Sequence, residues 1–203
     1  MEKKLAAVLS FLLHPAFAPL ISLIILFYSP TYLSLIAPSW KQRILLITAV
    51  GTVLIPFSLL PLLYFRKLTE QVRFGKHQDR FLPLFFSTIS YYFTYHIFQR
   101  LAVPDILEIL LLSATITVFV TMLITIFYRI SLHTIAWGGL TGIFLALCLR
   151  FGMVFTPWLI GIIILAGLSG YARLAMQAHK TGEIYTGYLT GFALNFVLIF
   201  FLR

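Results

Sequence analysis

The chain has 203 residues, of which 61% are hydrophobic and 10% charged, and its mean hydropathy is +1.00. An average soluble domain is about half apolar and roughly 25% charged, so this composition excludes a soluble globular protein and predicts that lipid surrounds most of the chain. The formal net charge is +9, and because the cations lie between apolar segments we expect anionic headgroups and membrane lipids as partners, and no nucleic acid. The single cysteine, Cys148, excludes an intrachain disulfide and a thiolate metal cage.

Seven segments are apolar and long enough to be considered as membrane crossings, for which a helix needs about 20 residues. They cover residues 5–28, 43–65, 81–102, 105–128, 134–151, 155–172 and 184–202. The fifth and sixth are short and are separated only by a turn around Arg150 and Pro157, so the number of crossings is six or seven. The sequence has no internal repeat or flexible linker. We therefore predict one all-α domain over residues 1–203, an integral membrane bundle of six or seven helices in a bacterial inner membrane.

The first segment begins after Met1-Glu2-Lys3-Lys4 and continues to Tyr28. It is too long for the core of a signal peptide and lacks a clear small-residue cleavage site, so we expect it to be retained. His14-Pro15 and Pro19 interrupt it, and because proline removes a backbone donor and disfavours helix in the preceding residue, we predict a broken helix here.

The polar loops point to one side of the membrane. With seven crossings, the N-terminus and residues 66–80, 129–133 and 173–183 share a side and carry ten of the 15 lysines and arginines. This distribution favours the cytoplasm for that side. Several of these cations are also candidates for ligand binding, so the orientation stays open.

Three clusters of ionisable residues lie at the predicted membrane boundaries, where such residues are costly to keep unless they are paired or used. The first runs from Arg73 to Arg80, the second is Ile130-Ser131-Leu132-His133, and the third combines Arg173, His179 and Glu183. Guanidinium groups bind phosphate oxygens in bidentate fashion, and two histidines can supply a nucleophile and a proton donor. The clusters therefore predict a phosphate site at one membrane interface.

The third cluster contains a further signal. His179 and Glu183 are four residues apart, and residues at that spacing share a face if they lie on one helix. The carboxylate can then accept a hydrogen bond from one imidazole nitrogen and leave the other as a nucleophile, as the acid of a catalytic triad does.

These residues resemble the membrane-bound type 2 phosphatidic acid phosphatases, a family of lipid phosphatases related to the vanadium haloperoxidases. The family motifs are Lys, six residues, Arg-Pro; then Pro-Ser-Gly-His; then Ser-Arg, five residues, His, three residues, Asp. The corresponding residues here are Arg73 to Arg80-Phe81, Ile130-Ser131-Leu132-His133, and Ala172-Arg173 to His179 to Glu183, within residues 73–183.

The resemblance implies a metal-independent enzyme with no cofactor. His179 would form a phosphohistidine, Glu183 would orient it, and His133 would be the general acid for the leaving group. The phosphate would be held by Arg73, Arg80, Arg173 and Ser131, with Lys76 as an alternative to the family lysine. The implied substrates are lipid phosphates such as phosphatidic acid, phosphatidylglycerol phosphate, undecaprenyl diphosphate and lipid A phosphates.

The sequence departs from the family pattern at several positions. Arg73 for Lys and Glu183 for Asp keep the charge, whereas Ala172 removes a hydroxyl and Leu132 stands where glycine would let the backbone approach phosphate closely. The alternative function is therefore a non-catalytic protein of the same scaffold that binds or transports phospholipid or ions.

Two other features are interpreted as structural. His14 and His96 are expected to be hydrogen-bonded packing or interface residues. The pairs Gly138, Gly142 and Gly187, Gly191 form small-xxx-small patterns after each of the two motif histidines. Such patterns allow helices to approach closely, and we predict that this contact brings His133 and His179 together.

Overall fold

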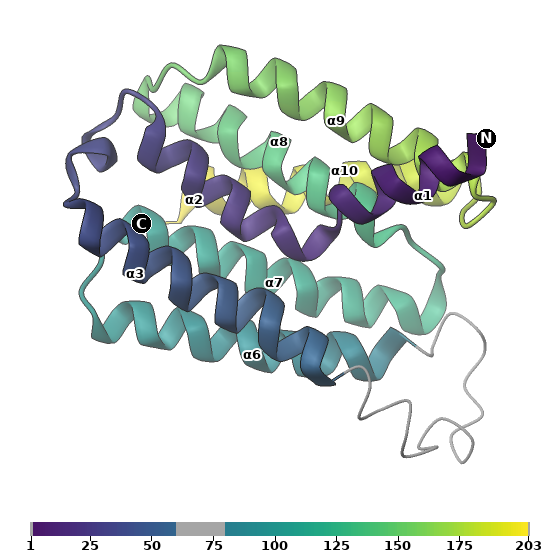
Figure 1. Cartoon of the computed structure of the whole chain (residues 1–203), viewed down its shortest axis with the longest axis horizontal. Helices are drawn as coiled ribbons and strands as arrows, with labels where there is room; N and C mark the ends of the chain where they lie inside the picture. The colour runs from purple at the N-terminus through teal and green to yellow at the C-terminus, as the bar shows by residue number, and fades with distance from the viewer. Residues whose placement is uncertain (1, 60–79, 203) are drawn as a thin grey trace.

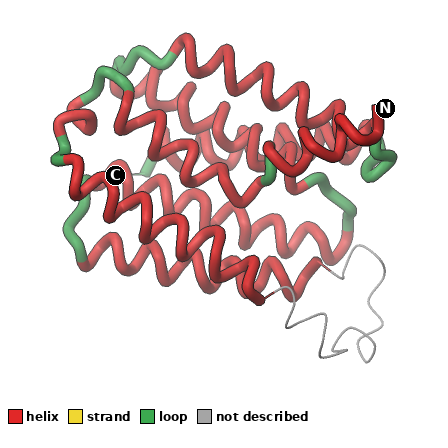
Figure 2. Tube along the Cα trace, in the orientation of Figure 1, coloured by secondary structure: helices red, strands yellow, loops and turns green. Residues whose placement is uncertain are grey.

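The computed structural model describes residues 2–59 and 80–202, and every regular element in those ranges is helical (Figures 1 and 2). The predictions for Arg73 and Lys76 concern residues outside the described ranges. The main helices are α1 (Glu2–Leu12), α2 (Ala18–Tyr28), α3 (Pro38–Ala49), α6 (Phe81–Arg100), α7 (Asp105–Phe127), α8 (Leu132–Phe151), α9 (Thr156–Ala175) and α10 (Thr181–Phe201).

The fold confirms a helical bundle with several helices suited to a membrane. Six helical segments in the described ranges are long and apolar enough to cross one, namely Glu2–Tyr28, Pro38–Leu59, Asp105–Phe127, Leu132–Phe151, Thr156–Ala175 and Thr181–Phe201. Helix α6 is not among them, although it has 20 residues, because tyrosine, histidine and glutamine lower its hydropathy. It nevertheless lies beside α7 along its length (Figure 1). Residues 2–59 and 80–202 therefore contain six helical segments that are long and apolar enough to cross a membrane and a further helix of matching length.

The first segment is broken where the sequence predicts. Helix α1 ends at Leu12, a short 3-10 turn covers Pro15–Phe17, and α2 starts at Ala18. His14 between them is extended, with φ −64° and ψ 135°, as expected for a residue before proline. The two helices meet at an angle in Figure 1, and the Leu13 carbonyl at the break accepts a hydrogen bond from buried Trp137.

The second predicted crossing begins earlier than expected. Helix α3 starts at Pro38 rather than at residue 43, because proline at the first helical position is compatible with a helix start. A π-helical stretch, Val50–Leu54, follows it. Within that stretch Gly51 lies against α6: a Cβ placed on it would overlap the Thr94 side chain, and Ser90 donates a hydrogen bond to the Gly51 carbonyl over 2.5 Å.

The glycine patterns on α8 and α10 form a close helix contact, as predicted. A Cβ on Gly138 would overlap the carbonyl oxygen of Tyr188, and one on Gly191 would overlap that of Ile135. The backbones therefore touch without intervening side chains. This contact brings the start of α8 next to the start of α10, where the amide of Ser131 donates to the Glu183 carbonyl over 3.2 Å.

Candidate active site

The centre of the site is a pair formed by His179 and Glu183. The turn between α9 and α10 reverses the chain, with Gln177 at a left-handed φ of 53°. Nδ1 of His179 lies 2.6 Å from Oε2 of Glu183, which also accepts from the backbone amide of Lys180 over 3.3 Å. The prediction that both residues lie on one helix face is wrong in detail, since α10 begins at Thr181. Glu183 in the first turn instead reaches back to the residues that precede the helix.

Both members of this pair are buried, with His179 7% and Glu183 9% exposed. Burial lowers the pKa of His179, the hydrogen bond to Glu183 opposes that effect, and the charges of Arg80 and Arg173 lower the pKa further. The imidazole is therefore neutral at pH 7. Because Nδ1 pairs with the carboxylate, Nε2 carries a lone pair that can attack an electrophile.

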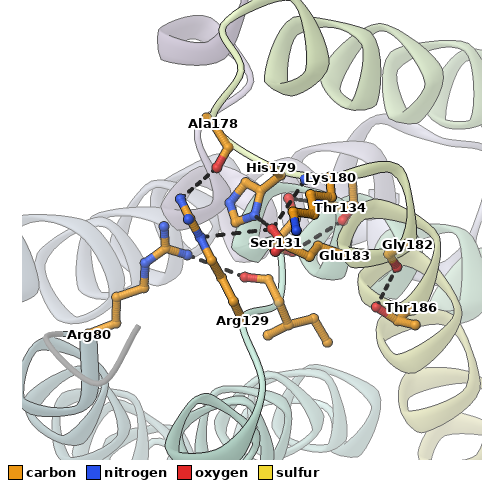
Figure 3. A network of polar contacts seen from close by, with 11 residues as sticks. Arg80, Arg129, Ser131, Thr134, Ala178, His179, Lys180, Gly182, Glu183 and Thr186 are labelled. Atoms are coloured by element: carbon orange, nitrogen blue, oxygen red, sulfur yellow. Dashed lines mark hydrogen bonds and ion pairs between the residues drawn. The ribbon is translucent and has the colours of Figure 1, made fainter. Parts of the chain in front are cut away.

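Three arginines from different parts of the chain act on the pair, and two of them, Arg80 and Arg129, are seen beside it in Figure 3. Nη1 of Arg80 donates to the carbonyl of Ile130 over 3.2 Å. Arg129 donates from Nη2 to the carbonyl of Ala178 over 2.7 Å, and its Nε lies 3.8 Å from Oε2 of Glu183. Burial and the charge of Arg129 lower the pKa of Arg80. These groups therefore lie close enough to repel one another.

Arg173 approaches the site from the last turn of α9. Its Nη1 donates to Oγ of Ser10 over 3.0 Å. Its Nε is buried and has no hydrogen-bond partner among the described residues. An unpaired buried donor is costly, so this guanidinium is incompletely satisfied without a further acceptor.

Ser131 is fully buried and caps α8. Its Oγ accepts from the amide of Thr134 at 3.5 Å, which accounts for the residue type at a helix start. Accepting this bond leaves the hydroxyl proton of Ser131 for another acceptor.

His133 is held by the first helix. Its Nε2 lies 3.0 Å from the carbonyl oxygen and 3.2 Å from Oγ of Ser10. A carbonyl only accepts, so Nε2 carries a proton, and Nδ1 is the nitrogen at which His133 can gain or release another. Nε1 of Trp137 donates to the carbonyl of Leu13 over 3.2 Å. The broken first segment is therefore bound to the start of α8.

His14 lies beside His133, with ring centroids 5.5 Å apart. Its Nδ1 accepts from the amide of Ala16 over 3.3 Å, and its ring contacts Phe57 with a centroid distance of 5.0 Å. The prediction of a hydrogen-bonded packing residue is correct for Nδ1, but the structure also brings His14 next to a predicted site residue. Exposed His96 instead pairs with Gln99 on α6, away from the cluster.

A mainly apolar cavity of about 450 Å³ begins at this cluster and runs between α2, α3, α6, α7 and α8. His14, Arg80 and Leu132 line one end, and Phe98 and Leu107 line it further along. The distance from residue 80 to residue 98 corresponds to about 27 Å of helix. The cavity therefore extends over most of the bundle length, with charged and polar groups at one end.

Comparisons of the chain with known protein families, with characterised proteins and with solved structures give no match. The resemblance to the type 2 phosphatases therefore stays a prediction that depends on the motif residues. No group of three or more histidine, cysteine, aspartate or glutamate side chains gathers in residues 2–59 and 80–202 in a way that could hold a metal ion.

The structure brings together Arg80, Ser131, His133, Arg173, His179 and Glu183 from the predicted set. Sequence reasoning missed Arg129 and Ser10. Arg129 lies two residues before Ser131, and that adjacency to a motif was a usable signal. Ser10 had none, since its place beside His133 depends on how α1 packs.

Proposed function

We propose that the chain is an integral membrane phosphatase that removes phosphate from a lipid phosphomonoester or an isoprenoid diphosphate through a phosphohistidine intermediate. The observation that carries this proposal is the His179–Glu183 pair, at 2.6 Å, among Arg80, Arg129 and Arg173. Three guanidinium groups around one carboxylate leave an excess of positive charge in a partly buried place. A bound phosphate would neutralise that excess and satisfy donors such as Nε of Arg173.

The proposed first step is an in-line attack on phosphorus. Nε2 of His179 forms the new bond to phosphorus while the bond from phosphorus to the oxygen on the lipid side breaks. A phosphomonoester releases the lipid as an alcohol after that oxygen takes one proton, and a diphosphate releases it as the lipid monophosphate. Glu183 stabilises the positive charge that develops on His179. His133 is the acid that the resemblance implies, since Ser10 holds Nε2 and leaves Nδ1 for the transferred proton.

In the second step water attacks phosphorus and gives a proton to Nδ1 of His133, which restores the acid of the first step, while the bond from phosphorus to Nε2 of His179 breaks. Inorganic phosphate leaves, and His179 returns to its neutral state. The arginines hold the three peripheral phosphate oxygens in both steps, which is electrostatic stabilisation of charge in a partly buried site. No oxidant, reductant or second substrate is needed.

The cavity supports a lipid as the substrate. Its walls are mainly apolar, and its volume of about 450 Å³ falls within the usual range of small-molecule pockets. Leu132, where the family has glycine, lines this cavity, so its side chain has a place in the apolar wall. A hydrocarbon chain in the cavity would leave its phosphate near Arg80.

The test is inorganic phosphate release by the detergent-purified protein, in the presence of a chelator, from a panel of lipid monophosphates and isoprenoid diphosphates. We expect release by the wild type and a loss of at least about 10⁴-fold in His179→Ala, because the nucleophile is gone. His96→Ala is the matched control, since that histidine is exposed and lies outside the cluster. Trapping with radiolabelled substrate should give an acid-labile phosphoprotein only when His179 is present.

Failure of release by folded wild-type protein on every substrate would overturn the catalytic proposal. If that preparation still bound lipid phosphates, and His179→Ala bound them equally well, the protein would be the non-catalytic phospholipid-binding or transport protein of the alternative.

A further inference from the structure

We infer that His14 is a further catalytic residue, whose neutral imidazole donates a hydrogen bond from Nε2 to the oxygen that leaves with the lipid. This inference rests on the proposed phosphatase function. His14 lies outside the three motifs, at the break between α1 and α2. It would add a hydrogen-bond donor to the groups that the motifs supply.

The first step of the argument is the protonation state of His14. Nδ1 accepts a hydrogen bond from the amide of Ala16 over 3.3 Å, so Nδ1 carries no proton. The proton of the neutral ring is therefore on Nε2. Nε2 has no hydrogen-bond partner in residues 2–59 and 80–202, although the side chain is half-buried. A donor in this position is available to a ligand.

The second step is the place of His14 relative to the cavity. Of the four histidines that the structure describes, His14 is the one that lines the cavity, and it does so at the end that Arg80 also lines. Arg80 connects the two parts of the site, since its charge also acts on His179. A lipid chain in the cavity thus contacts His14, and a phosphate bound at Arg80 lies at the same end of the cavity.

The third step is the direction of the reaction. In an in-line displacement the leaving oxygen lies opposite the nucleophile. The leaving oxygen is joined to the lipid chain, so it faces the cavity, where His14 lies, and the attacking Nε2 of His179 approaches from the other side. Negative charge develops on that oxygen as the bond from phosphorus breaks, and a fixed donor aimed at it lowers the barrier.

The chemistry assigns different tasks to the two neighbouring histidines. His14 keeps its proton throughout, because donating it would leave an imidazolate, and therefore acts as a neutral hydrogen-bond donor. His133 has its Nε2 proton engaged by the Ser10 carbonyl and can pass a proton from Nδ1. The two ring centroids lie 5.5 Å apart in an edge contact, so both imidazoles can reach the same leaving oxygen.

The test compares kcat/KM for two substrates with equal chains. One is dodecyl phosphate, whose alkoxide leaves poorly, and the other is a dodecyl-substituted nitrophenyl phosphate, whose phenolate leaves readily. We expect His14→Leu to lower kcat/KM about 10²-fold for dodecyl phosphate, as for loss of one oxyanion donor, and less than about tenfold for the nitrophenyl ester. His14→Gln, whose side-chain amide is a donor, should recover part of the loss. The ratio between substrates does not depend on how much of the variant is folded.

Equal losses for the two substrates in His14→Leu, or equal activities of the Leu and Gln variants, would overturn the inference and assign His14 to the turn alone. If the wild type is nevertheless active and its activity still requires His179, the proposed phosphatase function is retained. Absence of hydrolysis of both substrates by the wild type would overturn the proposed function and this inference together.

Discussion

The two sides of α8 differ in how they pack. Against α10 the helix backbones touch, and each glycine of the contact leaves no room for a Cβ. Toward α2, α3, α6 and α7 the side chains instead enclose a cavity of about 450 Å³. The groups proposed to do the chemistry, His133 on α8 and the His179–Glu183 pair at the start of α10, lie at the end of the close contact. A phosphoryl site needs fixed geometry, whereas a lipid chain needs space. Helix α8 contributes to both, through its close contact with α10 on one side and its cavity-lining residues on the other.

After removal of the nucleophile itself, the largest effect is expected from changing the acid of the pair. Glu183→Gln should reduce kcat about 10⁴-fold, by analogy with neutralising the acid of a catalytic triad, because the developing charge on His179 loses its partner. The measurement is phosphate release by protein whose thermal unfolding in detergent matches the wild type.

The same variant makes a prediction about pH. His179 attacks only when neutral, and burial together with the charges of Arg80 and Arg173 lowers its pKa from the ordinary value. Wild-type kcat/KM should therefore fall on the acid side as His179 becomes protonated, and on the alkaline side as His133 loses the Nδ1 proton that it donates. Loss of the Glu183 carboxylate removes an interaction that raises the pKa of His179, so the acid limb of Glu183→Gln should move to lower pH. A shift to higher pH would contradict the assignment.

The close contact itself can be broken. Gly191→Val should destabilise the protein by about 3 kcal/mol, because the added side chain overlaps the Ile135 carbonyl and forces α8 from α10. Gly161→Ala is the control, since a Cβ there meets nothing within 4 Å. Thermal unfolding in detergent measures both. Similar melting temperatures for the two variants would show that the contact is not under steric constraint.

A larger side chain in the cavity should change substrate binding rather than stability, unlike one in the close contact of α8 and α10. Ala114→Phe places a ring in the cavity and should raise KM for a long-chain lipid phosphate about tenfold, with little effect on a short-chain one, since it removes space for methylene groups. Ala193→Phe, on an exposed part of α10, should leave KM for both unchanged. An equal effect of Ala114→Phe on short and long chains would place the lipid elsewhere.

Much of the fold could be predicted because the signal for an apolar helix lies within the segment that forms it. Hydropathy over about 20 residues fixes where each helix lies, and the break at His14-Pro15 follows from the geometry of proline alone. The helix bounds agree with the predicted segments within a few residues except at Pro38. The close contact of α8 and α10 was also predictable, since glycines four residues apart on an apolar helix are typical of a surface where two helix backbones approach closely.

The site was predictable where it follows motifs and not where it depends on packing. The spacing of His179 and Glu183 predicted their pairing, but the details came from a turn with Gln177 in a left-handed conformation. Ser10 and His14 are more than 100 residues from His133 along the chain, and no local pattern connects them. Only the docking of α1 and the break beside α8 decides those contacts.

The sequence by itself thus determined the apolar composition suited to a membrane, the positions of the helices and the break in the first segment. It also determined which side-chain groups are available to bind a phosphate. Tertiary structure alone decided that Arg129 joins the cluster, that Ser10 engages one nitrogen of His133, and that His14 rather than His133 lines the cavity. The physical reason is range: hydropathy and backbone preferences act within a helix turn or two, whereas a hydrogen bond between helices depends on the packing of every side chain between them.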